Sequence, residues 1–159
     1  MKDPHLKYKR SLQSVFGYFG LNMPEEAERE LDALPAEAQT RPEVISLRTQ
    51  VLLMKAEWKH AATLAAAGHS LYPEVPDFYV QQALAFEQLG EPARAISMWQ
   101  ASPVRDSGFC HFNLARCEMQ LGNIQAAGEH MRKAMQLEPD LCRELKENQF
   151  PQHPTPKKI

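Results

Sequence analysis

Residues 106–140, DSGFCHFNLARCEMQLGNIQAAGEHMRKAMQLEPD, contain the pattern that decides the fold. Two stretches of helical periodicity meet at Leu121-Gly122, where the glycine suits a tight turn between paired helices. Small residues such as Ala115 and Ala127 alternate with large apolar ones, and Pro139 closes the second stretch. The sequence therefore predicts two antiparallel helices joined by a short turn.

The same pattern recurs along the chain with a step close to 34 residues. Small residues are spaced by 34, 34 and 32 positions at Ala27, Ala61, Ala95 and Ala127. A small residue where two helices cross lets the backbones approach closely, and the large residues beside it fill the surrounding space. Self-similarity with this period is the mark of a repeat architecture, in which each helix pair covers its neighbour.

The repeated pattern resembles the tetratricopeptide repeat, which pairs an aromatic, a leucine and a small residue on its first helix with alanine, an aromatic and proline on and after its second. The stretch 106–140 is the best match, and residues 76–107 carry both aromatic positions at Tyr79 and Trp99. The resemblance implies an all-α fold: a right-handed superhelical solenoid of antiparallel helix pairs with a C-terminal capping helix.

The resemblance also implies the organisation of the chain. We expect one helical repeat domain over residues 1–150, followed by a disordered tail at 151–159. The expected repeats, the first of them degenerate, and the capping helix span residues 8–41, 42–75, 76–107, 108–141 and 140–149. The third of these units is two residues short, and we place the deletion around Ser102 to Asp106, where Pro103 ends the second helix early.

Composition excludes several classes of function. The formal net charge is -2, with 18 Lys plus Arg against 20 Asp plus Glu, so no strong field favours nucleic acid. No apolar run reaches the roughly 20 residues that span a bilayer, and the N-terminus lacks the apolar stretch of a secretory signal. Three cysteines without a CxxC pair fit a reducing compartment. We therefore expect a cytoplasmic protein without membrane insertion.

The resemblance implies a binding site on the first helices of the repeats, which line a concave groove for a peptide segment or a partner protein. The residues that the repeat register turns into this groove are Ser46, Gln50, Val80, Leu84, Glu87, Phe109, Phe112, Arg116 and Met119. Phe109, Phe112 and Leu84 would anchor an apolar side chain of the partner, and Arg116 would hold a carboxylate. Phe112 fits the core between repeats equally well.

No catalytic residue, metal site or cofactor is predicted. Cys110-His111 with Cys117 lacks the paired ligands at short spacing from two elements that structural zinc sites use. The motifs GxGxxG, GxxxxGK[ST] and HExxH are absent.

Two functions remain open. The first hypothesis is an adaptor or scaffold that binds another protein. The alternative is a small cytosolic chaperone that holds a secreted or membrane-active client, and the Phe109 cluster also allows a homo-oligomer.

Overall fold

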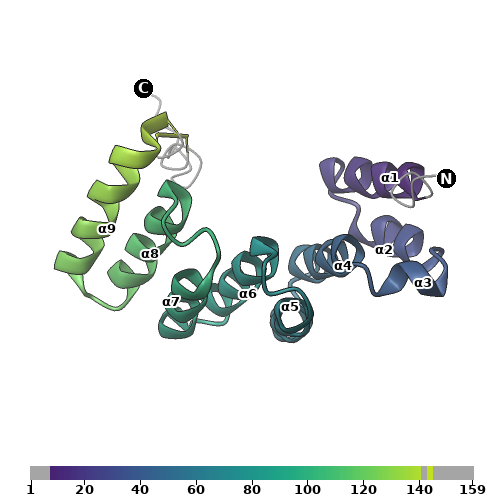
Figure 1. Ribbon diagram of the computed structural model, residues 1–159, viewed down its shortest axis with the longest axis horizontal. Helices are drawn as coiled ribbons and strands as arrows, with labels where there is room; N and C mark the ends of the chain where they lie inside the picture. The colour runs from purple at the N-terminus through teal and green to yellow at the C-terminus, as the bar shows by residue number, and fades with distance from the viewer. Residues whose placement is uncertain (1–7, 141–142, 145–159) are drawn as a thin grey trace, which may run out of the picture. The chain divides into compact units, whose positions relative to one another are not determined.

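The computed structural model describes residues 8–140 and 143–144, and within them it contains helices joined by turns and no strand (Figure 1). The helices are α1 (Lys9–Gly20), α2 (Pro24–Asp32), α3 (Ala36–Gln39), α4 (Pro42–Met54), α5 (Trp58–Leu71), α6 (Pro76–Gln88), α7 (Pro92–Ala101), α8 (Gly108–Gln120) and α9 (Ile124–Leu137). The helix pair predicted from residues 106–140 is α8 and α9, with its turn at Leu121-Gly122.

Contacts divide the chain into two compact units, Met1–Pro103 and Val104–Ile159. The described helices of the first unit are α1 to α7, and those of the second unit are α8 and α9. The single domain expected over residues 1–150 stays a prediction. The capping helix expected at 140–149 lies mostly outside the described residues, and the tail at 151–159 lies wholly outside them.

Helix boundaries follow local chemistry. Proline occupies the first turn of α2, α4, α6 and α7, where its missing N–H costs no hydrogen bond. Gly90 and Gly122 close α6 and α8 with φ of 72° and 78°, in the left-handed region that glycine adopts freely. Asn22 and Ala56 stand at the corresponding turns with φ of 55° and 58°. Ala56 therefore adopts the left-handed turn conformation with a steric penalty, because its Cβ approaches the following carbonyl oxygen.

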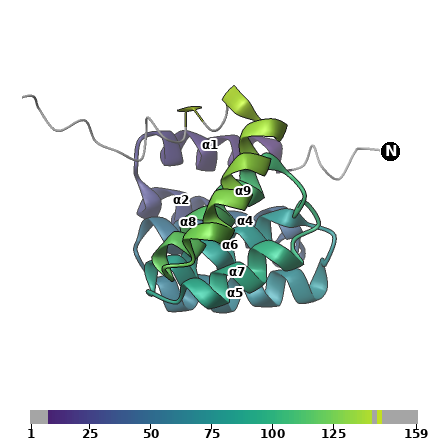
Figure 2. The same ribbon diagram turned by 90° about the vertical axis from the view of Figure 1, so that its left-hand side faces the viewer.

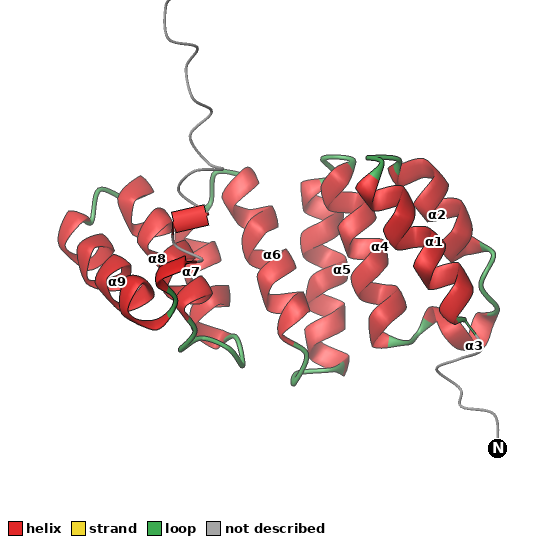
Figure 3. Ribbon diagram, turned by 90° about the horizontal axis from the view of Figure 1, so that it is seen from above, coloured by secondary structure: helices red, strands yellow, loops and turns green. Residues whose placement is uncertain are grey.

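The first unit places its helices in two layers. The first helices α4 and α6 lie in one layer, and the second helices α5 and α7 lie in the other (Figures 1 and 2). Neighbouring helices pack closely at residues without bulk: Gly68 of α5 lies against the ring of Phe78 in α6, which is fully buried. Figure 3 shows α4, α5 and α6 side by side from above. The register alanines Ala61 and Ala95 are fully buried, as the repeat predicts.

A short helix, α3, interrupts the connection from α2 to α4. Its last residue, Gln39, donates from Nε2 to the backbone oxygens of Leu31 and Leu34 at 3.0 and 2.8 Å. Arg48 of α4 donates in turn to Gln39 Oε1 at 2.7 Å and to Asp32 Oδ1 at 2.8 Å. Arg48 stands where the repeat favours leucine, and this polar network is the reason that the position accepts an arginine.

The second unit is a helix pair with a capped start. Ser107 Oγ accepts a hydrogen bond from Cys110 N at 3.2 Å, and Glu138 Oε1 accepts one from Gly108 N at 3.0 Å. Two N–H groups at the start of α8 are therefore satisfied by side chains on either side of the hairpin. Phe112 and Ala134 form the buried centre of the pair, with Met131 packed against them.

Candidate functional site

The first helices of the first unit meet at a polar contact. Gln81 of α6 donates from Nε2 to the backbone oxygen of Ser46 in α4 at 2.9 Å and to its Oγ at 3.1 Å. Ser46 Oγ lies 3.4 Å from Asp77 Oδ2 and donates to it. These bonds fix α4 beside α6, and they bring the predicted residue Ser46 next to the helix that carries Val80 and Leu84.

The remaining predicted residues of this unit separate into two groups. Gln50, Val80 and Leu84 are half-buried, so part of each side chain is open to a partner. Glu87 is 9% exposed and accepts a hydrogen bond from Trp99 Nε1 at 3.2 Å. Its carboxylate therefore faces α7 in the other layer, and a groove contact would have to displace a buried side chain.

The α8 face of the second unit carries a line of interacting residues. Asn113 donates from Nδ2 to the backbone oxygen of Phe109 at 2.9 Å, and Arg116 donates to Asn113 Oδ1 at 2.9 Å. Phe109 and Arg116 are half-buried, and Met119 is 56% exposed one turn further on. Phe112 is 2% exposed and belongs to the core of the pair, and this burial favours a core role over a groove contact.

Two buried amides at these faces are not among the nine predicted residues. Gln81 is 8% exposed and Asn113 is 3% exposed, and each organises a predicted neighbour through hydrogen bonds. They are 32 positions apart, the same step that separates Ala83 from Ala115. This shared register is the signal in the sequence that identifies them as equivalent positions.

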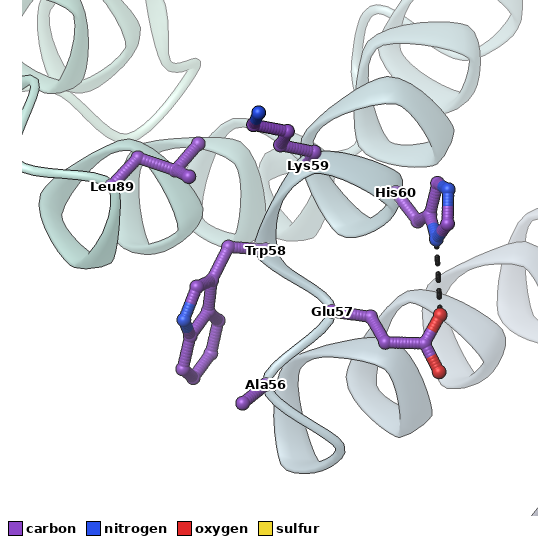
Figure 4. A pocket seen from close by; sticks show the side chains of 6 residues that line it. All are labelled: Ala56, Glu57, Trp58, Lys59, His60 and Leu89. Carbon is purple, nitrogen blue, oxygen red and sulfur yellow. Dashed lines mark hydrogen bonds and ion pairs between the residues drawn. The ribbon is translucent and has the colours of Figure 1, made fainter.

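A surface pocket of about 370 Å³ lies at the turn side of the first unit (Figure 4). Trp58 and Leu89 supply its apolar wall, and Glu57 and His60 stand at its edge with His60 Nδ1 3.0 Å from Glu57 Oε2. Lys55 binds Glu57 and Glu28 at 3.2 and 3.0 Å, and these hydrogen bonds raise the pKa of the lysine. None of the nine predicted residues lines this pocket.

Titratable side chains also meet between α8 and α9. His111 Nδ1 lies 3.0 Å from His130 Nδ1, and burial, followed by the charges of His130 and Lys133, lowers the pKa of His111. No group of three or more potential metal ligands occurs within residues 8–140 and 143–144. Cys110 and Cys117 are buried, and neither forms a disulfide in the described part of the chain.

Comparison with known proteins identifies the repeat and the fold. The tetratricopeptide repeat model matches residues 108–141. Among curated proteins, no match is found. The chain is similar to "MamA 41-end from Desulfovibrio magneticus RS-1", with a TM-score of 0.71 at 16% identity over 89% of this chain and 86% of that chain. A further crystal structure of MamA gives 0.70 at 17% identity, over 93% and 84%.

At such identity the likeness concerns the fold alone. MamA is a protein with a tetratricopeptide-like helical solenoid, so the all-α solenoid fold expected from the sequence is confirmed. The family match at 108–141 confirms the resemblance at the repeat that the sequence singles out as the best. Within the described residues, no helix is both long enough and apolar enough to cross a membrane.

Proposed function

We propose that this chain, whose residues 108–141 match the tetratricopeptide repeat, is a non-catalytic scaffold module that binds a segment of a partner protein on its first helices. The support comes from the family match and from the fold, because helical repeats of this kind expose long faces of side chains to a partner. The α4–α6 face and the α8 face are the proposed contact surfaces.

The observation that carries the proposal is the line Phe109, Asn113, Arg116 and Met119 on α8. An aromatic ring and a thioether supply apolar contact area, while the guanidinium supplies a charge-assisted hydrogen bond to a carboxylate. Asn113 holds Arg116 by a 2.9 Å hydrogen bond, so less side-chain freedom is lost when a partner binds. Aromatic residues and arginine are also the types that dominate binding energy at interfaces.

The α4–α6 face supports the same function with weaker chemistry. It offers the half-buried apolar groups of Val80 and Leu84 beside the amide of Gln50 and the hydroxyl of Ser46. Because no lysine or arginine is among these residues, we propose that this face contacts uncharged parts of the partner. A cytoplasmic location is part of the proposal, and the buried thiols of Cys110 and Cys117 support it.

The experiment is quantitative affinity capture from cells that express the protein. Immobilised wild-type chain is compared with Phe109→Ala, with Arg116→Glu and with the control Arg132→Glu, which changes an exposed arginine on α9. Circular dichroism and thermal melting establish that all four proteins are folded. The expected result is one soluble partner that the wild type and Arg132→Glu retain and that the other two variants lose.

Equal capture of the same partner by all four proteins would contradict the proposed α8 contact. Recovery of an aggregation-prone secreted protein in place of a stable soluble complex would assign the chain to the chaperone class. The same samples therefore separate the two functions that the sequence left open.

A further inference from the structure

The first helix exposes large apolar side chains that its own neighbours do not cover. α1 packs mainly on α2 and buries only Val15 fully within its bounds. On its other side Phe16 is 62% exposed and Leu21, directly after the helix, is 70% exposed. The ring of Phe16 meets Phe19 edge to face, with 6.3 Å between centroids.

The exposed residues form a shape that fits another helix. Gln13, Phe16, Gly17 and Gly20 are spaced as i, i+3, i+4 and i+7, so they surround one hole on the helix surface. Apart from α1's own backbone and the adjoining residues of the chain, no atom of the described residues lies within 4 Å of a Cβ placed at Gly17 or Gly20. The floor of the hole is therefore bare backbone, which leaves room for a large side chain and for close approach of a second helix.

The outer face of α1 is positively charged at its N-terminal end. Lys9 and Arg10 are exposed in the first turn of α1, and neither has an ion-pair partner among the described residues. No acidic residue occurs from Tyr8 to Pro24, and the next one, Glu25, lies beyond the opposite end of α1. A partner that lies along α1 is therefore attracted if it carries acidic residues over the first turn.

We propose that the outer face of α1, formed by Gln13, Phe16, Gly17, Gly20 and Leu21, binds an amphipathic helix of a partner protein. The partner helix inserts one large apolar side chain into the hole at Gly17 and Gly20, and packs a second, one turn away, against Leu21. Its acidic residues lie over Lys9 and Arg10. This surface shares no residue with the α4–α6 and α8 faces, and it serves a second contact of the scaffold.

The probe for this surface is a displayed library of single-helix peptides with a randomised apolar face and randomised flanks. Selection against the wild-type chain is expected to enrich peptides with two large apolar residues one helical turn apart and with Asp or Glu toward one end. Fluorescence anisotropy then gives the dissociation constant of an enriched peptide for each variant.

Two sets of variants test where the peptide binds. Gly17→Gln with Gly20→Gln fills the hole, and Lys9→Glu with Arg10→Glu reverses the charge. We expect each pair to weaken the peptide by about tenfold or more, which corresponds to about 1.4 kcal/mol. The matched controls are Gly128→Gln on α9, another exposed helical glycine with open space around it, and Arg132→Glu. Both controls are expected to bind the peptide as the wild type does.

The glycine variants are expected to fold, because Gln is a better helix former than Gly and no described part of the chain obstructs a side chain at these positions. Unchanged peptide affinity in both variant pairs, or enrichment of peptides without helical periodicity, would overturn the proposal.

Two further measurements test whether this chain itself covers the α1 face: sedimentation equilibrium of the wild type, and peptide affinity after truncation. A wild-type dimer that Gly17→Gln with Gly20→Gln dissociates would assign the face to a second copy, and tighter peptide binding after removal of residues 1–7 would assign it to this chain's own N-terminus.

Because Phe109→Ala and Arg116→Glu lie on α8, they are expected to leave peptide binding at α1 unchanged. Unchanged partner capture by both α8 variants, with peptide binding lost in the α1 variants, would therefore refute the proposed α8 contact and leave the α1 surface intact. Loss of partner capture in the α8 variants, with peptide binding unchanged in the α1 variants, would support the α8 contact and refute the α1 surface.

Discussion

His111 of α8 and His130 of α9 face each other with their Nδ1 atoms 3.0 Å apart and their ring planes at 27°. A hydrogen bond between two Nδ1 atoms needs one of them to be unprotonated, because a doubly protonated imidazole is a donor at both nitrogens. The contact between α8 and α9 therefore depends on at least one histidine remaining neutral.

This relationship makes the stability of the chain depend on pH. Burial lowers the pKa of His111 below its ordinary value of 6.5, and His130 and Lys133 lower it further, while Asp106 acts in the opposite sense. The unfolded chain then binds more protons than the folded chain below pH 6.5. The contribution of His111 is present above that pH and is lost as the pH falls through the lowered pKa.

Urea unfolding between pH 7.5 and 5 measures this effect on the wild type and on His111→Gln. We expect His111→Gln to show a shallower loss of stability on acidification, whatever its stability at pH 7.5. If the free energy of unfolding fell equally steeply with pH in the two proteins, His111 would not be the source of the pH dependence. A His111 titration midpoint at or above pH 6.5 in NMR would lead to the same conclusion.

Gly68→Ala is expected to destabilise the first unit although alanine is the better helix former. A Cβ at residue 68 would lie 2.5 Å from Cε1 and 2.7 Å from Cγ of Phe78, a ring that is fully buried. Overpacking of this kind costs about 1–3 kcal/mol. The free energy of unfolding from urea titration is the measurement, and an unchanged value would mean that α5 and α6 do not meet at Gly68.

Gly128→Ala is the matched substitution without a clash. Residue 128 is an exposed position of α9, and no other element within residues 8–140 and 143–144 lies within 4 Å of an added Cβ. Removing the conformational freedom of glycine from a helix stabilises it by about 0.5–1 kcal/mol. We expect the same urea titration to move in the opposite direction from Gly68→Ala, and a loss of stability would contradict the open environment of residue 128.

Gln39→Ala tests the polar network around α3. The substitution removes the donor to the backbone oxygens of Leu31 and Leu34 and the acceptor for Arg48, so we expect a loss of about 1–3 kcal/mol. Asp32→Ala removes only the exposed end of the same network, where a surface ion pair contributes about 0–1 kcal/mol. Equal losses in thermal or urea unfolding would show that Gln39 does not hold the connection.

Much of the fold is predictable because the repeat depends on local rules. Ala27, Ala61, Ala95 and Ala127 are all buried, as close helix crossings require. The short helix α3 is not predictable in this way. It depends on Gln39, whose partners lie on both sides of it in the sequence, and no periodic pattern marks such a contact.

The candidate site is less predictable than the fold, because helical periodicity gives the side of a helix and not the partners of each side chain. The repeat register assigns Glu87 and Phe112 to the groove. In the structure, Glu87 accepts a hydrogen bond from Trp99, and Phe112 packs with Ala134. The partners of both residues lie on the second helix of a repeat, α7 for Glu87 and α9 for Phe112, and such contacts depend on tertiary packing.

Isothermal titration of the captured partner tests most directly whether Arg116 and its neighbours on α8 bind a partner protein. Arg116→Glu is expected to raise Kd by about tenfold or more, the size of effect of losing one charge-assisted contact. The control Arg132→Glu is expected to leave Kd unchanged. Equal Kd values for the wild type and both folded variants would contradict a binding site at Arg116.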